Sequence, residues 1–231
     1  MDAFDQGALN RFIIDNGVVG FFTEGRTLKS GRFSYWYANC RNLASTVKLI
    51  DRTADFLIAF IAARGLECDY VYGVPAGITG LATIVNYKRG MTGDREHRVV
   101  IGREKAKPHG DPRDRYFIGK VERGDRVVVI EDVTTTGGSM LNSLGALAEV
   151  GVTVVAAVSI IDRMERRDDG KSVAECVVER GSIYCSMTDA DQLIRLAIDR
   201  YRPEADFLHR FQQRYNEYAM KKIDVAPRGG S

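Results

Sequence analysis

The chain has 231 residues, of which 45% are hydrophobic, and its 33 basic and 31 acidic side chains give a net charge of +2. This size and apolar content predict one α/β domain with a sizeable core. The near balance of charge gives no indication of nucleic-acid binding, and no apolar run is long enough to cross a membrane. The four cysteines lack zinc-site or C-x-x-C spacing and Met1 opens no signal-peptide pattern, so we expect reduced thiols and a cytoplasmic protein.

The N-terminal part of the chain predicts a small unit of its own. Helical spacing of apolar residues covers 4–15 and 46–64, the second helix being capped by Ser45 and ended by Gly65. Residues 18–45 between them are irregular or strand-like and rich in aromatic side chains. Because residues 1–45 break the alternation that follows, we expect them to form a hood over the edge of a sheet.

From residue 69 onward, strand and helix patterns alternate. The predicted strands cover 69–74, 98–102, 126–131, 152–161 and 182–187. The predicted helices cover 76–88, 138–149, 172–180, 189–199 and 204–221, with Asp189 capping the fourth and Pro203 in the first turn of the last. This alternation predicts a mostly parallel, twisted sheet flanked by helices, in a single domain over 1–223. We expect residues 224–231 to form a disordered tail.

The most informative stretch is residues 127–139, where an apolar strand ends in Glu131 and Asp132 and a Thr/Gly-rich loop leads into a helix. Open α/β sheets bind ligands at their carboxyl edge, and two neighbouring carboxylates there can accept hydrogen bonds from a vicinal diol. The loop offers N–H and hydroxyl groups at a helix N-terminus, which predicts an anion site. A Glu-Asp pair alone is more often structural, but this loop is richer in phosphate-binding groups than a turn needs. A diol beside a phosphate indicates a ribose 5-phosphate.

A long polar segment, residues 103–117, precedes that stretch. Its basic residues Arg103, Lys105, Lys107 and His109 alternate, so an extended chain would place them on one side. Such a row suits a multiply charged anion such as pyrophosphate. A solvated surface loop is the alternative, and the residues alone leave both interpretations open.

Three shorter segments are ambiguous on their own. Lys-Ser-Gly-Arg at 29–32, followed by aromatic residues, predicts no more than a turn. Asp-Arg-Met-Glu at 162–165, at the end of a predicted strand, is commonly a structural ion pair. Gly-Val-Pro-Ala-Gly at 73–77 would let a ligand approach the backbone after a strand.

Together these segments resemble the type I phosphoribosyltransferases. The strand, the acidic pair and the Thr/Gly loop are similar to their phosphoribosyl pyrophosphate signature. Arg-x-x-x-Lys-x-His-Gly at 103–110 resembles the flexible catalytic loop of the orotate phosphoribosyltransferases. The segments at 29–32 and 162–165 resemble the hood and the base-recognition motif of that family, and these two favour orotate over a purine.

The resemblance implies that ribose 5-phosphate is transferred from phosphoribosyl pyrophosphate to N1 of orotate. It implies Mg²⁺ held mainly by substrate oxygens and water, and a homodimer in which the 103–115 loop reaches the partner's site. The implied catalytic residues are Lys107 and Asp132. The implied substrate-binding residues are Lys29, Tyr37, Arg103, Lys105, His109, Glu131, Val133, Thr134, Thr135, Thr136, Gly137, Gly138, Ser139 and Arg163.

Some positions depart from the family's pattern. Ala38 stands where a second aromatic residue is expected, Ala76 where a larger residue is common, and Glu104 where Lys is common, with Lys105 one position later. The role of Arg41 stays open.

Two alternative functions also remain: a phosphoribosyltransferase for a purine or another base, and a non-catalytic regulator that senses phosphoribosyl pyrophosphate. A regulator would be expected to carry a nucleic-acid-binding module or a basic face.

Overall fold

The computed structural model describes residues 3–28, 30–93 and 97–226. At its centre is a parallel sheet whose four strands run in the order β3–β6–β7–β8. These strands are β3 (Tyr70–Gly73), β6 (Arg126–Thr134), β7 (Thr153–Asp162) and β8 (Ile183–Asp189). Residues 127–130 of β6 have no solvent exposure, because helices cover both faces of the sheet.

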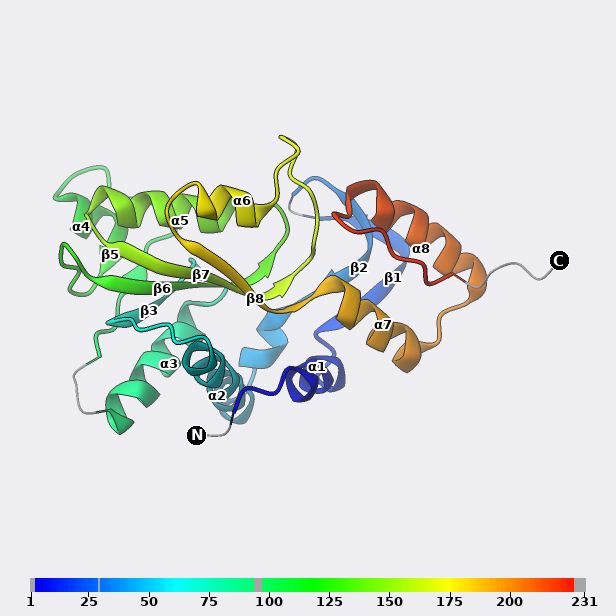
Figure 1. Ribbon diagram of the computed structural model, residues 1–231, viewed down its shortest axis with the longest axis horizontal. Coiled ribbons are helices and arrows are strands. Elements are labelled where there is room, and N and C mark those ends of the chain that lie inside the picture. The colour runs from blue at the N-terminus through cyan, green and yellow to red at the C-terminus, as the bar shows by residue number, and fades with distance from the viewer. Residues whose placement is uncertain (1–2, 29, 94–96, 227–231) are drawn as a thin grey trace.

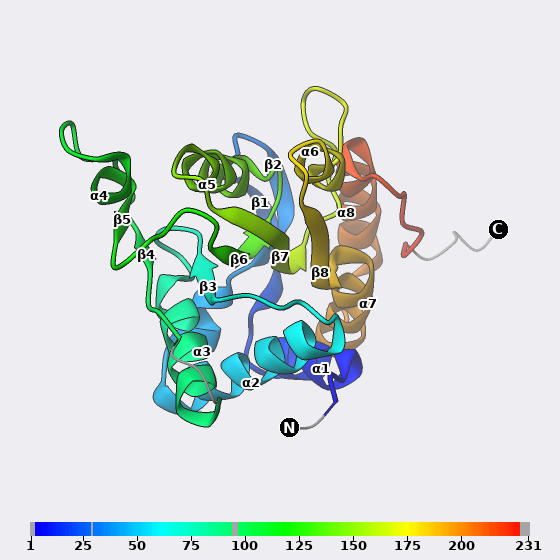
Figure 2. The same cartoon turned by 60° about the vertical axis from the view of Figure 1, so that its left-hand side comes forward.

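Two pairs of helices form the outer layers. In Figures 1 and 2, α5 and α6 lie over one face of the sheet, and α2 and α3 lie over the other. Their bounds are α2 (Val47–Ala63), α3 (Thr79–Thr92), α5 (Gly138–Glu149) and α6 (Val173–Val178). The predicted fold class, a mostly parallel sheet flanked by helices, is confirmed.

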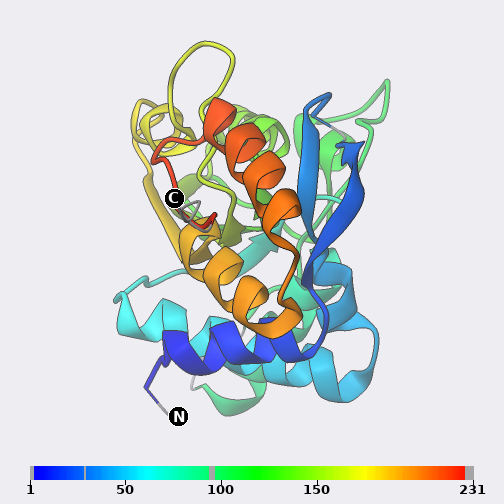
Figure 3. The same cartoon turned by 90° about the vertical axis from the view of Figure 1, so that its right-hand side faces the viewer.

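A second region lies beyond the carboxyl edge of the sheet. Its antiparallel hairpin consists of β1 (Val19–Thr27) and β2 (Phe33–Ala38), and it is joined to the core by a short 3₁₀ turn, η1 (Cys40–Ala44). The helices beside it are α1 (Gln6–Asp15), α7 (Ala190–Tyr201) and α8 (Ala205–Tyr218). Figure 3 shows α8 packed along the hairpin.

Aromatic side chains join this hairpin to α8. The Phe21 ring of β1 meets the rings of Phe207 and Phe211 edge-on, at centroid distances of 5.5 and 5.4 Å. On β2, the ring of Tyr35 lies 5.8 Å from that of Phe207. The predicted hood, residues 1–45, thus packs on the C-terminal helix, and the division of the chain into domains stays a prediction.

Several predicted boundaries are wrong. Thr46, rather than Ser45, caps α2, because its side chain accepts the N–H of Leu49. The helix predicted from residue 76 begins at Thr79, since residues 75–78 form a turn. Pro203 lies outside α8, whose N-cap is Glu204.

The polar segment also contains structure that its sequence did not predict. The strand expected over 98–102 shrinks to β4 (Ile101–Gly102), which pairs with β5 (Phe117–Ile118) and is followed by the short helix α4 (Pro112–Tyr116). Asp111 caps α4 by accepting the N–H of Arg113. We call residues 101–118 the arm, and Figure 2 shows it projecting away from the sheet.

Part of the predicted tail is attached to α8. The N–H groups of Val225 and Ala226 donate to Gln212 Oε1 at 2.6 and 2.8 Å. The rest of that tail, residues 227–231, lies outside the described residues.

Among the described helices, none has the length and apolar character that a membrane span requires.

Candidate active site

The two predicted carboxylates lie within β6, which continues to Thr134. Glu131 is 7% exposed, and its Oε2 accepts a hydrogen bond from Thr134 Oγ1 at 3.0 Å. Asp132 is half-buried, and its Oδ1 accepts the N–H of Val133 at 2.9 Å. Adjacent strand residues point to opposite faces, so the two carboxylates have different surroundings. Glu131 is turned back onto its own strand, whereas Asp132 faces the turn that follows β3.

That turn, residues 74–78, approaches Asp132 closely. It is fastened to β6 by the N–H of Val74, which donates to the Ile130 carbonyl at 2.9 Å. The peptide bond between Pro75 and Ala76 is cis. A Cβ placed on Gly77 would lie 3.1 Å from Asp132 Oδ2, so glycine permits this approach. The backbone of the turn thus lies beside the more accessible of the two carboxylates.

Residues 133–139, which we call the phosphate loop, end at the N-terminus of α5. Gly137 is the N-cap with φ 68°, and no side chain caps the helix. A Cβ on Gly137 would lie 2.6 Å from Val173 Cγ1. Both the positive φ and this contact require glycine. The first N–H groups of an uncapped helix lack intrahelical partners and suit an anion, as the sequence predicts for the loop. The half-buried residues Thr135 and Thr136 precede this helix start.

The basic residues of the arm do not lie with these groups. Lys105, Lys107 and His109 are exposed. Arg103 is held within the arm, where its N–H donates to the Tyr116 carbonyl at 2.8 Å and its Nε to the Asp114 carbonyl at 3.1 Å. Figure 2 shows the arm pointing away from the body of the chain. The structure therefore presents Lys105, Lys107 and His109 away from the part of the chain that carries the carboxylates.

Of the two base-site residues predicted in the N-terminal part of the chain, the structure describes one, on β2 of the hairpin. Lys29 lies outside the described residues. Tyr37 is half-buried and pairs with Gly20 of β1, and its ring lies 4.9 Å from that of Phe22. A Cβ on Gly20 would come within 2.5 Å of the Tyr37 hydroxyl, so the ring lies directly over that glycine.

Arg163 connects the sheet to the hairpin. It is 3% exposed, and burial lowers the pKa of its guanidinium. Nε donates to Glu165 Oε1 at 2.8 Å and Nη2 to Ser34 Oγ at 3.0 Å, while the guanidinium carbon lies 4.0 Å from the centre of the Trp36 ring. Ser34 and Trp36 are two apart on β2 and so share a face. The predicted base-recognition arginine is thus held in a fixed orientation.

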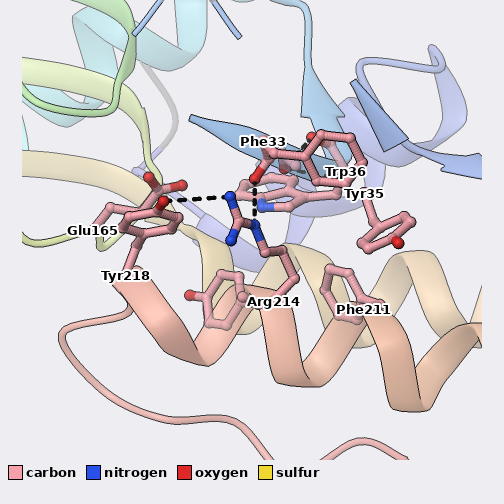
Figure 4. Close-up of a pocket in the computed structure, with 9 residues that line it drawn as sticks. Phe33, Tyr35, Trp36, Glu165, Phe211, Arg214 and Tyr218 are labelled. Atoms are coloured by element: carbon pink, nitrogen blue, oxygen red, sulfur yellow. Dashed lines mark hydrogen bonds between the residues drawn. The ribbon is translucent and has the colours of Figure 1, made fainter. Parts of the chain in front are cut away.

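The sequence did not predict that a second arginine shares the Glu165 carboxylate with Arg163. Arg32, from the Lys-Ser-Gly-Arg segment, donates through Nη1 to the other oxygen of Glu165 at 3.1 Å and through Nη2 to Asp168 at 2.7 Å. One buried carboxylate therefore lies between two arginines. A small pocket adjoins it, where Arg214 of α8 donates to the Phe33 carbonyl and the Tyr218 hydroxyl (Figure 4).

The described residues contain no group of three or more His, Cys, Asp or Glu side chains placed to hold a metal ion. Mg²⁺ prefers oxygen ligands and keeps several waters, and it is commonly held by one or two carboxylates together with substrate phosphates. Asp132, beside the 74–78 turn, provides a carboxylate of this kind. The residues present therefore fit a metal that arrives on a phosphorylated substrate.

Comparison with known proteins identifies the family. Residues 98–183 match the family model described as a phosphoribosyl transferase domain. The orotate phosphoribosyltransferase of Pyrococcus abyssi is 32% identical over 158 residues, covering 68% of this chain and 81% of that protein. That of Methanopyrus kandleri is 31% identical over 166 residues, covering 72% and 80%. The crystal structure of the Francisella tularensis orotate phosphoribosyltransferase has the same fold, with a TM-score of 0.68 and 20% identity over 90% of this chain and 98% of that one. The chain therefore belongs to the orotate phosphoribosyltransferase family.

Proposed function

We propose that this protein transfers ribose 5-phosphate from 5-phosphoribosyl 1-pyrophosphate to N1 of orotate, a step in the synthesis of UMP. The bond from C1 of the ribose to pyrophosphate breaks with its electron pair leaving on pyrophosphate, the C1–N1 bond forms, and N1 loses its proton. The products are orotidine 5′-monophosphate and pyrophosphate. The observation that carries the proposal is the uncapped N-terminus of α5, which follows Glu131 and Asp132 after the short phosphate loop.

The sugar phosphate binds along the end of β6. Its 5-phosphate accepts hydrogen bonds from the N–H and hydroxyl groups of the phosphate loop. Its ribose hydroxyls donate to Asp132, the more accessible carboxylate, whereas Glu131 accepts from Thr134 in this structure and reaches the ribose only on leaving that hydrogen bond. As the leaving group departs, C1 gains positive charge, as it does in glycoside hydrolysis. The Asp132 carboxylate then lies near this charge and stabilises it.

The pyrophosphate end requires cations that this subunit does not bring to its own carboxylates. In the proposal they come from the arm of a second copy in a homodimer, with Lys107 as the catalytic cation and Arg103, Lys105 and His109 as ligands of the anion. The exposure of Lys105, Lys107 and His109 supports this assignment. Mg²⁺ bound to pyrophosphate oxygens supplies further neutralisation of the departing charge.

Orotate lies between the phosphate loop and the hood. Arg163 is proposed to recognise the base, with Thr135, Tyr37 and Lys29 as further contacts. The orientation of Arg163 by Glu165, Ser34 and Trp36 supports a fixed recognition geometry. Because Nε donates to Glu165 and Nη2 to Ser34, the donors left for the carboxylate of orotate are those of Nη1 and the second N–H of Nη2.

The test is an absorbance assay of orotate consumption with phosphoribosyl pyrophosphate and Mg²⁺. We expect consumption that requires both the sugar donor and Mg²⁺, with hypoxanthine and adenine left unchanged in parallel reactions. Turnover of a purine without turnover of orotate would show that the base substrate is a purine and not orotate. Tight binding of the donor with no turnover of any base would indicate the sensing role instead.

A further inference from the structure

A tight turn after β7 lies behind the phosphate loop. The N–H of Arg167 donates to the Lys171 carbonyl at 2.9 Å, and the N–H of Gly170 donates to the Arg167 carbonyl at 3.0 Å. Asp169 accepts the Lys171 N–H at 3.0 Å and the Arg167 Nε at 3.2 Å. The hydrogen bond from Lys171 lowers the pKa of Asp169, so this carboxylate is charged at neutral pH. The Arg167 side chain is therefore held at its Nε end by the turn itself.

The other end of the Arg167 guanidinium reaches the phosphate loop. Nη1 donates to the carbonyl of Thr136. Two residues earlier, the Thr134 carbonyl accepts the N–H of Arg163 at 2.9 Å. Gly137 rests against Val173, at the start of α6. Residues 163–173 thus hold the loop from one side at three successive points.

The planarity of the peptide bond gives these contacts a directional consequence. In a trans peptide unit, the carbonyl of one residue and the N–H of the next point in opposite directions. Because the 163–173 segment holds the Thr134 and Thr136 carbonyls, the N–H groups of Thr135 and Gly137 point away from that segment. A hydrogen-bonded carbonyl also polarises its peptide unit, which strengthens the N–H as a donor.

We propose that Arg167 is a positioning residue for the 5-phosphate, which it aligns by fixing the peptide unit between Thr136 and Gly137. The inference rests on the proposed function and adds a residue that neither the acidic pair nor the Thr/Gly loop indicates. Arg167 does not contact the phosphate, because it binds the carbonyl side of the loop. Its removal weakens phosphate binding and leaves the base site unchanged.

The chain provides a matched control in the neighbouring Arg166. Its side chain is exposed, while its backbone N–H pairs with the Tyr218 carbonyl, a bond that a side-chain substitution leaves in place. Arg166→Gln and Arg167→Gln therefore remove the same charge from adjacent positions. Arg167→Lys keeps the charge but loses the forked geometry that joins Asp169 to Thr136.

The experiment measures binding of ribose 5-phosphate by calorimetry, together with the KM values for phosphoribosyl pyrophosphate and orotate. In Arg167→Gln we expect the Kd for ribose 5-phosphate and the KM for the sugar donor to rise about tenfold, the effect of losing one charge-assisted hydrogen bond. The KM for orotate and the melting temperature stay near wild type. Arg166→Gln matches wild type throughout, and Arg167→Lys falls between the two.

Equal ribose 5-phosphate affinity in the two Gln variants would overturn the proposal. A parallel rise in the KM for orotate would overturn it too, since it would indicate general loosening of the site. Ribose 5-phosphate binding needs no base. A wild-type protein that binds it but leaves orotate unchanged would therefore refute the proposed function, while the Arg167 comparison would still be decided by the binding data.

Discussion

The phosphate loop and the arm are proposed to bind the two ends of one substrate, yet they are constructed in opposite ways. The loop continues a buried strand and is held from behind by residues 163–173. The arm is joined by the two-residue strands β4 and β5, and its residues 104–111 are all exposed. Few buried contacts mean low local stability. The 5-phosphate stays on the sugar throughout the reaction and suits a rigid site, whereas a leaving group suits an element that can close and reopen.

The largest expected effect of a single substitution comes from the arm. Lys107→Ala lowers kcat/KM on the order of 10²-fold, the scale of losing one group that stabilises developing charge. The melting temperature stays unchanged, because the side chain is exposed. Steady-state kinetics with a thermal melt measure both. Lys120→Ala is the control, since this exposed lysine follows the arm and pairs only with Glu122 among the described residues. Equal rates in the two variants would remove Lys107 from catalysis.

On the phosphate-loop side of the site, Asp132→Asn tests the carboxylate that is proposed to lie beside the sugar. We expect kcat to fall by roughly 10- to 100-fold, because the neutral amide stabilises the cationic sugar poorly. Asparagine can still accept the Val133 N–H, so the melting temperature changes little. Kinetics and thermal unfolding on the same sample separate the two effects. A lower melting temperature with unchanged kcat would show that Asp132 is structural.

Gly137→Ala tests how tightly the loop is packed. A left-handed residue with a Cβ costs roughly 1–2 kcal/mol, and here the Cβ would also meet Val173. We expect a lower urea midpoint and a higher KM for the sugar donor. Val173→Ala relieves the contact but removes buried methyl groups, so we expect Gly137→Ala to cost less in a Val173→Ala background than in wild type. For the urea midpoint, Gly138→Ala is the control, because a Cβ there meets nothing within 4 Å. Identical midpoints for the two alanine variants would mean that the loop is looser than described.

The smallest effect concerns Asp162, buried at the end of β7. Burial raises the pKa of this carboxyl group, although Met164 N–H and the Tyr184 hydroxyl donate to it. The native state therefore binds the proton more tightly than the unfolded chain, and this contribution to stability is lost as the pH rises from about 4 through the native pKa. Urea unfolding at pH 4 and pH 7 should show Asp162→Asn gaining stability relative to wild type as the pH rises. The opposite trend would contradict the assignment.

The parts of the fold that sequence could predict are those with local signals. An apolar run followed by the acidic pair and a Thr/Gly-rich loop predicted β6, the phosphate loop and α5, because each signal lies within a few residues of the element it specifies. In the arm, α4 and β5 were missed, since polar residues carry no apolar periodicity. The pairings of Arg32 with Glu165 and of Arg167 with Thr136 span 133 and 31 residues of sequence. Only the folded chain brings these partners together.

The most direct test of the proposed division between a rigid phosphate loop and an arm supplied by the partner subunit is to mix two impaired variants. Lys107→Ala and Asp132→Asn subunits are combined in equal amounts, allowed to exchange, and assayed for orotate consumption. If each arm serves the partner's site, half of the dimers are hybrids and each hybrid has one complete site of two, so activity returns to about a quarter of wild type. If each arm serves its own site, no complete site can form, and activity stays at the level of the separate variants.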